Sequence, residues 1–219
     1  MKRRILLYVV WLVCVILMTG CKPNPLAQSG NNRNDGTMLT TFEYEKRDGE
    51  IAVVCHFGIP SIIPNDDGTD SIMMTGLSNT YETFGLPFLT VKLALPKDSA
   101  IEAVTASWGE EAAINDVVLR ENEYEATEDS ASKDNSLADT KNQWMASASV
   151  QEFYGVRVAY VTVFPVSYQP EQKLVSYCGN AKVLLSLKES KWNLSRFDSD
   201  AEQEIKEIVD NPGDVGDYI

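Results

Sequence analysis

The feature that most constrains the fold is a β-rich block from Phe153 to Leu187, FYGVRVAYVTVFPVSYQPEQKLVSYCGNAKVLLSL. Between Val156 and Phe164 every second residue is Val, Val, Tyr, Thr or Phe, and the residues between them change from Arg157 to alanine and valine. This alternation predicts a strand that begins half exposed and becomes apolar on both faces. Such a strand suits a sheet that packs against a second sheet.

Two prolines divide the block into shorter strands. Pro165 cannot donate a hydrogen bond to a neighbouring strand, and Pro170 presets the backbone of a turn, so the first strand has to end near residue 165 and the chain has to reverse before Lys173. We therefore expect a meander of three strands, at residues 153–165, 172–178 and 181–188. By pattern alone, the block fits any antiparallel β domain with a proline-marked hairpin.

The rest of the chain adds strands and one helix. Residues 39–47 and 50–57 flank an Asp-Gly turn and predict a hairpin. Two further strands are expected, one opened by Gly85-Leu86-Pro87 and running through Leu95, the other at residues 100–108. Ser199-Asp200-Ala201-Glu202 matches a capping box and predicts a short helix over residues 200–210. The fold class predicted is all-β: an antiparallel β-sandwich-like domain with a short C-terminal helix.

The N-terminus has the composition of an export signal. Three basic residues, Lys2 to Arg4, precede an apolar run from Ile5 to Met18, and Thr19-Gly20-Cys21 follows. The alternative, a transmembrane anchor, is disfavoured because the apolar core is short and no charged stop-transfer cluster follows it. The final residues resemble a bacterial lipobox, which implies lipidation of Cys21. We expect the chain to be exported and lipid-anchored in the bacterial cell envelope, at the outer membrane.

The chain is strongly acidic. Its net charge is −13, from 19 Lys and Arg against 32 Asp and Glu, and loss of the three basic signal residues leaves 16 against 32, or −16. This charge makes nucleic-acid binding unfavourable. It also disfavours adhesion to anionic headgroups, so membrane contact is expected through the lipid on Cys21.

Two cysteines remain in the folded part. Cys14 leaves with the signal and Cys21 takes the lipid, so Cys55 and Cys178 could pair in a disulfide in an oxidising compartment. The alternative, two separate buried thiols, is favoured because each lies in or beside a predicted strand. Although His56 adjoins Cys55, neighbouring side chains in a strand point to opposite faces, so the pair is no catalytic dyad.

The sequence carries none of the familiar catalytic motifs. There is no Gly-x-Ser-x-Gly elbow, no His-Glu-x-x-His, no Cys-x-x-Cys and no phosphate loop, and His56 is the single histidine. The segment Asn65–Asp70, NDDGTD, lacks the alternating acids and the closing Glu of a calcium loop, which favours a solvated turn. We predict no enzymatic activity, no cofactor and no metal site in this chain.

Eight positions of the block resemble the end of the N-terminal prodomain of gingipain-type cysteine peptidases (peptidase family C25): Gly155, Arg157, Val158, Val161, Val163, Pro165, Tyr168 and Pro170. In that family a Gly-x-Arg-Val strand runs into a Pro-x-x-Tyr-Asn-Pro turn, and Gln169 stands here in place of the usual Asn. Residues 85–108 also resemble the family, which has a Gly-x-Pro opening, a strand and a proline-marked turn before another strand. Thr90 replaces a further proline of the family pattern.

The resemblance implies the prodomain of a secreted gingipain-like cysteine peptidase, acting as intramolecular inhibitor and folding aid by covering the active-site cleft. A prodomain of this class lays a loop across the cleft, in some members with a basic residue in the specificity pocket. Here that loop would be the acidic segment 120–143, with Lys133 and Lys141 as candidates and Arg120 as a third at its base. The alternative is that these charges only solubilise a loop. In the prodomain interpretation, the block from Phe153 to Leu187 is a scaffold that helps to hold this loop in place.

The implied partner is a gingipain-like cysteine peptidase domain, in cis after Ile219 or in trans. In the family, a Tyr followed by aliphatic residues opens the first catalytic strand, and the chain reaches Tyr218-Ile219 in that order. The expected organisation is a lipoprotein signal peptide at 1–20, an Asn-, Pro- and Gly-rich flexible tether at 21–38, a prodomain-like β-sandwich at 39–198, and a short helix with a linker toward a downstream catalytic domain at 199–219.

The alternative function is a free-standing surface lipoprotein whose β-sandwich binds a glycan or a protein partner. Three tryptophans of the folded part, Trp108, Trp144 and Trp192, are as suited to a core as to a binding platform. A reading frame that continues with a βα pattern and a His followed by a Cys would favour the prodomain.

Overall fold

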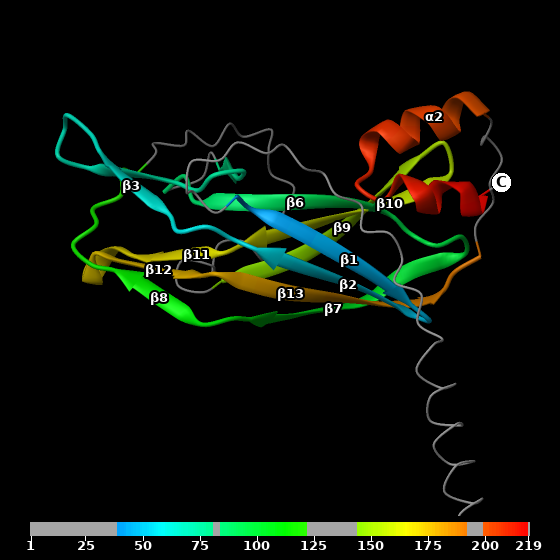
Figure 1. The fold of residues 1–219 in the computed structure, drawn as a ribbon, viewed down its shortest axis with the longest axis horizontal. Helices are drawn as coiled ribbons and strands as arrows, with labels where there is room; N and C mark the ends of the chain where they lie inside the picture. Colours follow the sequence, from blue (N-terminus) through cyan, green and yellow to red (C-terminus); the bar gives the residue numbers. More distant parts are fainter. Residues whose placement is uncertain (1–38, 81–83, 122–143, 192–198, 219) are drawn as a thin grey trace, which may run out of the picture. The chain divides into compact units, whose positions relative to one another are not determined.

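Antiparallel pairing of strands builds most of this fold. The computed structural model describes residues 39–80, 84–121, 144–191 and 199–218, which belong to one compact unit, Asn32–Ile219. These residues form thirteen strands in four sheets and one short α-helix (Figure 1). The predicted fold class, an all-β antiparallel sandwich-like domain with a short C-terminal helix, is confirmed.

The first four-stranded sheet has the order β1-β2-β13-β7. Its strands are β1 (Thr41–Arg47), β2 (Glu50–His56), β13 (Asn180–Glu189) and β7 (Ser99–Trp108). The β1–β2 hairpin turns at Asp48-Gly49, and Gly49 has a φ of +73°, a conformation that glycine adopts without strain. The hairpin predicted from the Asp-Gly turn is therefore present.

The second four-stranded sheet has the order β5-β6-β10-β9. Its strands are β5 (Ser78–Asn79), β6 (Pro87–Ala94), β10 (Val156–Phe164) and β9 (Met145–Phe153). Strand β10, the alternating strand of the sequence block, is antiparallel to both of its neighbours. The tight turn before it places Tyr154 and Gly155 at positive φ.

Two smaller sheets complete the fold. One has the order β11-β12-β8, and the other pairs β3 with β4. Their strands are β11 (Val166–Gln169), β12 (Leu174–Cys178), β8 (Glu111–Ile114), β3 (Ser61–Pro64) and β4 (Asp70–Met73). The helical segments are the 3₁₀ turn η3 (Pro170–Gln172), the helix α2 (Ser199–Ile208) and the 3₁₀ segment η4 (Pro212–Tyr218).

The expected three-strand meander is wrong in its pairing, although its strands exist. Strand β10 ends next to Pro165, as predicted, but the chain then crosses into a different sheet, where β11 and β12 form a hairpin around η3. Strand β13 pairs with β2 and β7 and leaves β12 to pair with β8. The chain therefore changes sheet at Pro165 and again at the Cys178-Gly179 bend. The sheets that β12 and β13 join are set by strands more than 60 residues away in the chain.

The two four-stranded sheets share one hydrophobic core. Val53 and Val183 come from the first sheet, Val91 and Val161 from the second, and all four are fully buried in a single cluster. Strand β10 is apolar on both faces because both are covered. Ala159, Val161 and Val163 enter this core, whereas Val156 and Val158 face a second cluster formed with α2 and η4.

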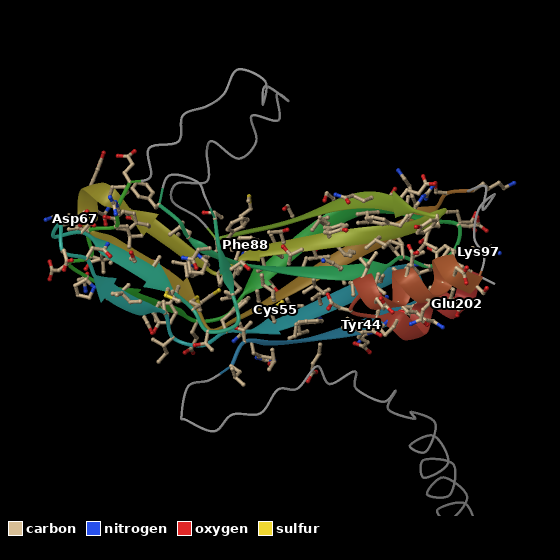
Figure 2. The ribbon with its side chains drawn as sticks, turned by 90° about the horizontal axis from the view of Figure 1, so that it is seen from above. Tyr44, Cys55, Asp67, Phe88, Lys97 and Glu202 are labelled. Atoms are coloured by element: carbon tan, nitrogen blue, oxygen red, sulfur yellow. The ribbon has the colours of Figure 1, made fainter. Side chains whose placement is uncertain are left out.

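The helix and the β3–β4 hairpin lie at opposite ends of the sheets. Figure 1 shows α2 beside the turn between β9 and β10, with β3 at the far end. Figure 2 shows the same separation, with Asp67 of the β3–β4 turn remote from Glu202 of α2. Changes at one end can therefore serve as controls for changes at the other.

Candidate functional site

The turn motif of the block, through Tyr168, holds the residues that lead into the acidic segment 120–143. The Tyr168 hydroxyl on β11 donates a hydrogen bond to the carbonyl of Val117 at 3.0 Å and accepts one from the N–H of Leu119 at 3.2 Å. The Tyr168 side chain is buried, and its ring and that of Phe84 form a T-shaped pair with a centroid distance of 5.0 Å. One buried phenol thus satisfies two backbone groups just before residue 122.

Strand β4 holds the same segment from another side. The Asp70 carboxylate accepts a hydrogen bond from the N–H of Val118 at 2.8 Å, and the Asp70 N–H donates to the Val118 carbonyl at 2.6 Å. The N–H of Arg120 donates to the Asp70 carbonyl at 3.1 Å, which completes a short parallel bridge. Residues 117–120 are therefore fixed by backbone and side-chain bonds.

The other end of the segment returns onto the same hairpin. The Trp144 indole N–H donates to the Ser176 carbonyl of β12 at 3.4 Å, and its ring lies 5.8 Å from the ring of Trp108. Ser176 pairs with Ser167 in the β11–β12 ladder, next to Tyr168. The β11–β12 hairpin therefore contacts both described ends of segment 122–143.

Of the predicted basic candidates, the structure describes only Arg120. Its side chain is exposed, and its Nε lies 3.7 Å from the carboxylate of Asp67 in the β3–β4 turn. The pKa of Asp67 is lowered, chiefly by hydrogen bonds from the Thr69 hydroxyl and N–H and then by the charge of Arg120. Lys133 and Lys141, like Cys21, lie outside the described residues.

Next to this loop base, the β3–β4 hairpin exposes large apolar side chains. Ile63 and Met73 are diagonal neighbours on its outer face, because Ser61 pairs with Met73 and Ile63 with Ser71. Met73 is 53% exposed, and Ile59, which leads into β3, is 72% exposed. Exposed apolar side chains gathered at one place are typical of a surface that another protein covers.

Cys55 and Cys178 are free, fully buried thiols. Burial, with a smaller contribution from the nearby Cys178, raises the pKa of Cys55 to about 12. Burial also raises the pKa of Cys178 to about 12, against an opposing effect of backbone hydrogen bonds. His56 is exposed on the other face of β2. At neutral pH neither thiol is ionised, so neither is a nucleophile in this fold.

These thiols make stability fall at alkaline pH. The pKa of an unfolded thiol is about 8.5, so below that pH the thiols are protonated in both the folded and the unfolded state. Their contribution to the free energy of unfolding is then fully present. Between about pH 9 and pH 12 only the unfolded state ionises, and the free energy of unfolding falls by up to about 1.4 kcal/mol per pH unit for each thiol. Urea unfolding at pH 8, 9 and 10 checks this. A double variant, Cys55→Ala with Cys178→Ala, should have a flatter profile; equal slopes would contradict the prediction.

No protein-family model matches this sequence, and no curated protein does. Solved structures do. The chain matches a prodomain chain in the complex of the Porphyromonas gingivalis RgpB pro- and mature domains, with a TM-score of 0.53 and 14% identity over 83% of this chain and 99% of that chain. This chain has the gingipain prodomain fold. A structure of gingipain K from the same organism, described as giving insight into zymogenic latency, matches with a TM-score of 0.49 and 17% identity over 71% of this chain and 96% of that chain.

Two residues of the resemblance have structural roles in this prodomain fold. Arg157 donates from Nη1 to the Ser99 carbonyl at 2.5 Å, which links β10 to the start of β7. Tyr168 anchors residues 117–119. Sequence reasoning noticed Tyr168 as a motif residue but missed its partners, as well as Asp70 and Trp144. Asp70 lies between Thr69 and Ser71 in a polar run, so no local pattern marked it.

The described residues contain no group of three or more His, Cys, Asp or Glu side chains placed to hold a metal ion. In the same ranges, no helix combines the length and the apolar character that a membrane span requires.

Proposed function

We propose that this chain is the prodomain of a secreted gingipain-like cysteine peptidase, and that it inhibits the peptidase by covering the active-site cleft and assists its folding. The observation that carries the proposal is the match of fold over 99% of a prodomain chain. The β11–β12 hairpin, which contacts both described ends of segment 122–143, supports it. An inhibitory loop benefits from such a base, because a loop whose two ends are fixed before binding loses less conformational entropy on binding.

In this proposal segment 122–143 is the inhibitory loop, and the β domain holds the two ends of that loop. A basic side chain, Lys133 or Lys141, would enter the pocket that reads substrate side chains. Arg120 is the third candidate, because its exposed ion pair with Asp67 is weak and costs little to break. If the peptidase is joined to this chain, the tether gives the loop a high effective concentration, and latency then needs only modest intrinsic affinity.

The proposal assigns no catalysis to the domain itself. Both thiols in the described residues are buried and protonated, and His56 lies on the opposite face of β2 from Cys55. The peptidase partner would supply all of the catalytic groups.

We propose further that residues 1–20 direct export and that Cys21 carries the lipid that anchors the chain to the cell envelope. Incorporation of labelled palmitate tests this step. The wild-type chain should take up label, and Cys21→Ala should not; label in the variant would exclude Cys21 as the lipidated residue.

The peptidase should also cover the exposed face of the β3–β4 hairpin, since that face adjoins the loop base. We expect Met73→Asp to weaken binding to a gingipain-type peptidase at least about tenfold, because it buries a charge in the interface. Isothermal titration calorimetry measures the change. Val150→Asp is the matched control, because Val150 on β9 is a similarly exposed apolar residue away from the hairpin. Equal losses in both variants would remove the hairpin from the interface.

Calorimetry on the unmodified chain tests the proposal as a whole. The chain should form a one-to-one complex with a gingipain-type peptidase, and alanine at Lys133 and Lys141 together should weaken it. An unchanged affinity would exclude both lysines as pocket residues. No detectable complex would favour the free-standing lipoprotein.

A further inference from the structure

Strand β6 has one edge that a neighbouring strand covers only at its start. On one side it pairs with β10 over Leu89–Ala94, whereas on the other side β5 reaches only Pro87 and Phe88. In an antiparallel ladder, the N–H and C=O of alternate residues point to the same side. Lys92 and Ala94 therefore present these groups to the edge away from β10, where the described residues provide no paired strand.

Two residues after helix α2 satisfy all four of these backbone groups. The Asp210 N–H donates to the Lys92 carbonyl at 2.7 Å, and the Asp210 carboxylate accepts from the Lys92 N–H at 2.7 Å. Asn211 Oδ1 accepts from the Ala94 N–H at 2.7 Å, and Asn211 Nδ2 donates to the Ala94 carbonyl at 2.9 Å. The contact is that of a neighbouring strand, made by side chains as well as backbone.

The Asn211 amide suits this position because it carries a donor and an acceptor side by side, as a peptide group does. It is 1% exposed, and its Nδ2 also donates to the Asp214 carboxylate at 2.9 Å. An aspartate of the same shape would accept only, so it would leave the Ala94 carbonyl without a donor and face Asp214 with a like charge.

Apolar contacts hold these two residues in place. Val209 and Val215 flank them and are buried in the cluster formed with α2. Tyr218 is buried as well, and its hydroxyl donates to the Leu95 carbonyl. Lys46 of β1 lies 3.7 Å from Asp214, so the segment also reaches the edge strand of the other sheet.

We propose that residues 209–218 are an edge cap, a segment that occupies the outer edge of β6 and prevents a second copy of this chain from adding its own β6 there. An unpaired edge is a template for another strand, and residues 91–95, VKLAL, are mostly apolar and well suited to strands. Two identical edges can pair antiparallel about a two-fold axis, which is why a second copy is the occupant. The cap needs no peptidase, so it stands apart from the inhibitory role.

The test compares hydrogen exchange and mass of the full chain with those of Asn211→Asp. We expect the Lys92 and Ala94 amides to exchange at least about tenfold faster in the variant, and light scattering to show a dimer that grows with concentration. Ile72→Val, a mild core change at the opposite end, is the control and should leave both amides protected and the chain monomeric.

Unchanged exchange at Lys92 and Ala94 would overturn the cap, as would an equal acceleration in Ile72→Val. Faster exchange in a chain that stays monomeric at every concentration would overturn its protective role. If Asn211→Asp does not fold, Asp210→Ala provides the second test, because it removes only the acceptor for Lys92 and should accelerate exchange at that amide first.

Discussion

Replacing Tyr168 by alanine is expected to lower the free energy of unfolding by about 3–5 kcal/mol, the loss typical of a large buried aromatic side chain. The ring contacts Phe84 and lies in the main core, so its removal leaves a cavity. Tyr168→Phe isolates the hydroxyl. It leaves the Val117 carbonyl and the Leu119 N–H without their partner, which should cost about 1–3 kcal/mol.

The phenylalanine variant also separates stability from inhibition. At a temperature where it stays folded, residues 117–119 lose one attachment, so we expect weaker inhibition of a gingipain-type peptidase. Tyr154→Phe is the control, since that hydroxyl bonds Glu204 on an exposed surface at the opposite end. Denaturant unfolding and inhibition titrations should be run on both. If Tyr168→Phe inhibits like the wild type, this hydroxyl does not position the loop.

Ile205→Ala is expected to lower the free energy of unfolding by about 2–5 kcal/mol. Ile205 is the fully buried residue of α2 and packs in the cluster with Val156, Val158 and Ala94. Ala201 is the other buried residue of the helix and is much smaller, so the packing of α2 on β10 should fail before the core melts. Limited proteolysis should then cut within residues 199–218 first, while inhibition at low temperature persists. A loss below about 0.5 kcal/mol would show that α2 does not depend on this contact.

Local signals predicted the local structure well. The Asp48-Gly49 turn predicted the β1–β2 hairpin, Pro165 predicted the end of β10, and Ser199-Asp200-Ala201-Glu202 predicted where α2 begins. In each case the cause lies within a few residues of its effect, where turn chemistry and capping act.

Long-range partners were not predictable in the same way. The Tyr168 hydroxyl bonds groups 49 and 51 residues upstream, and Asn211 bonds a strand 117 residues upstream. Neither of these hydrogen-bonded contacts produces a periodic pattern in the sequence. The assignment of β12 and β13 to different sheets likewise depends on strands β8 and β2, which one sequence read alone does not identify.

We propose that this fold inhibits a gingipain-like cysteine peptidase. The most direct measurement is a titration of the purified chain into such a peptidase, with cleavage of a fluorogenic peptide as the readout. We predict a stoichiometric loss of activity at submicromolar concentration, weakened in Tyr168→Phe and retained in Tyr154→Phe. Full activity at micromolar excess of the chain would contradict the account.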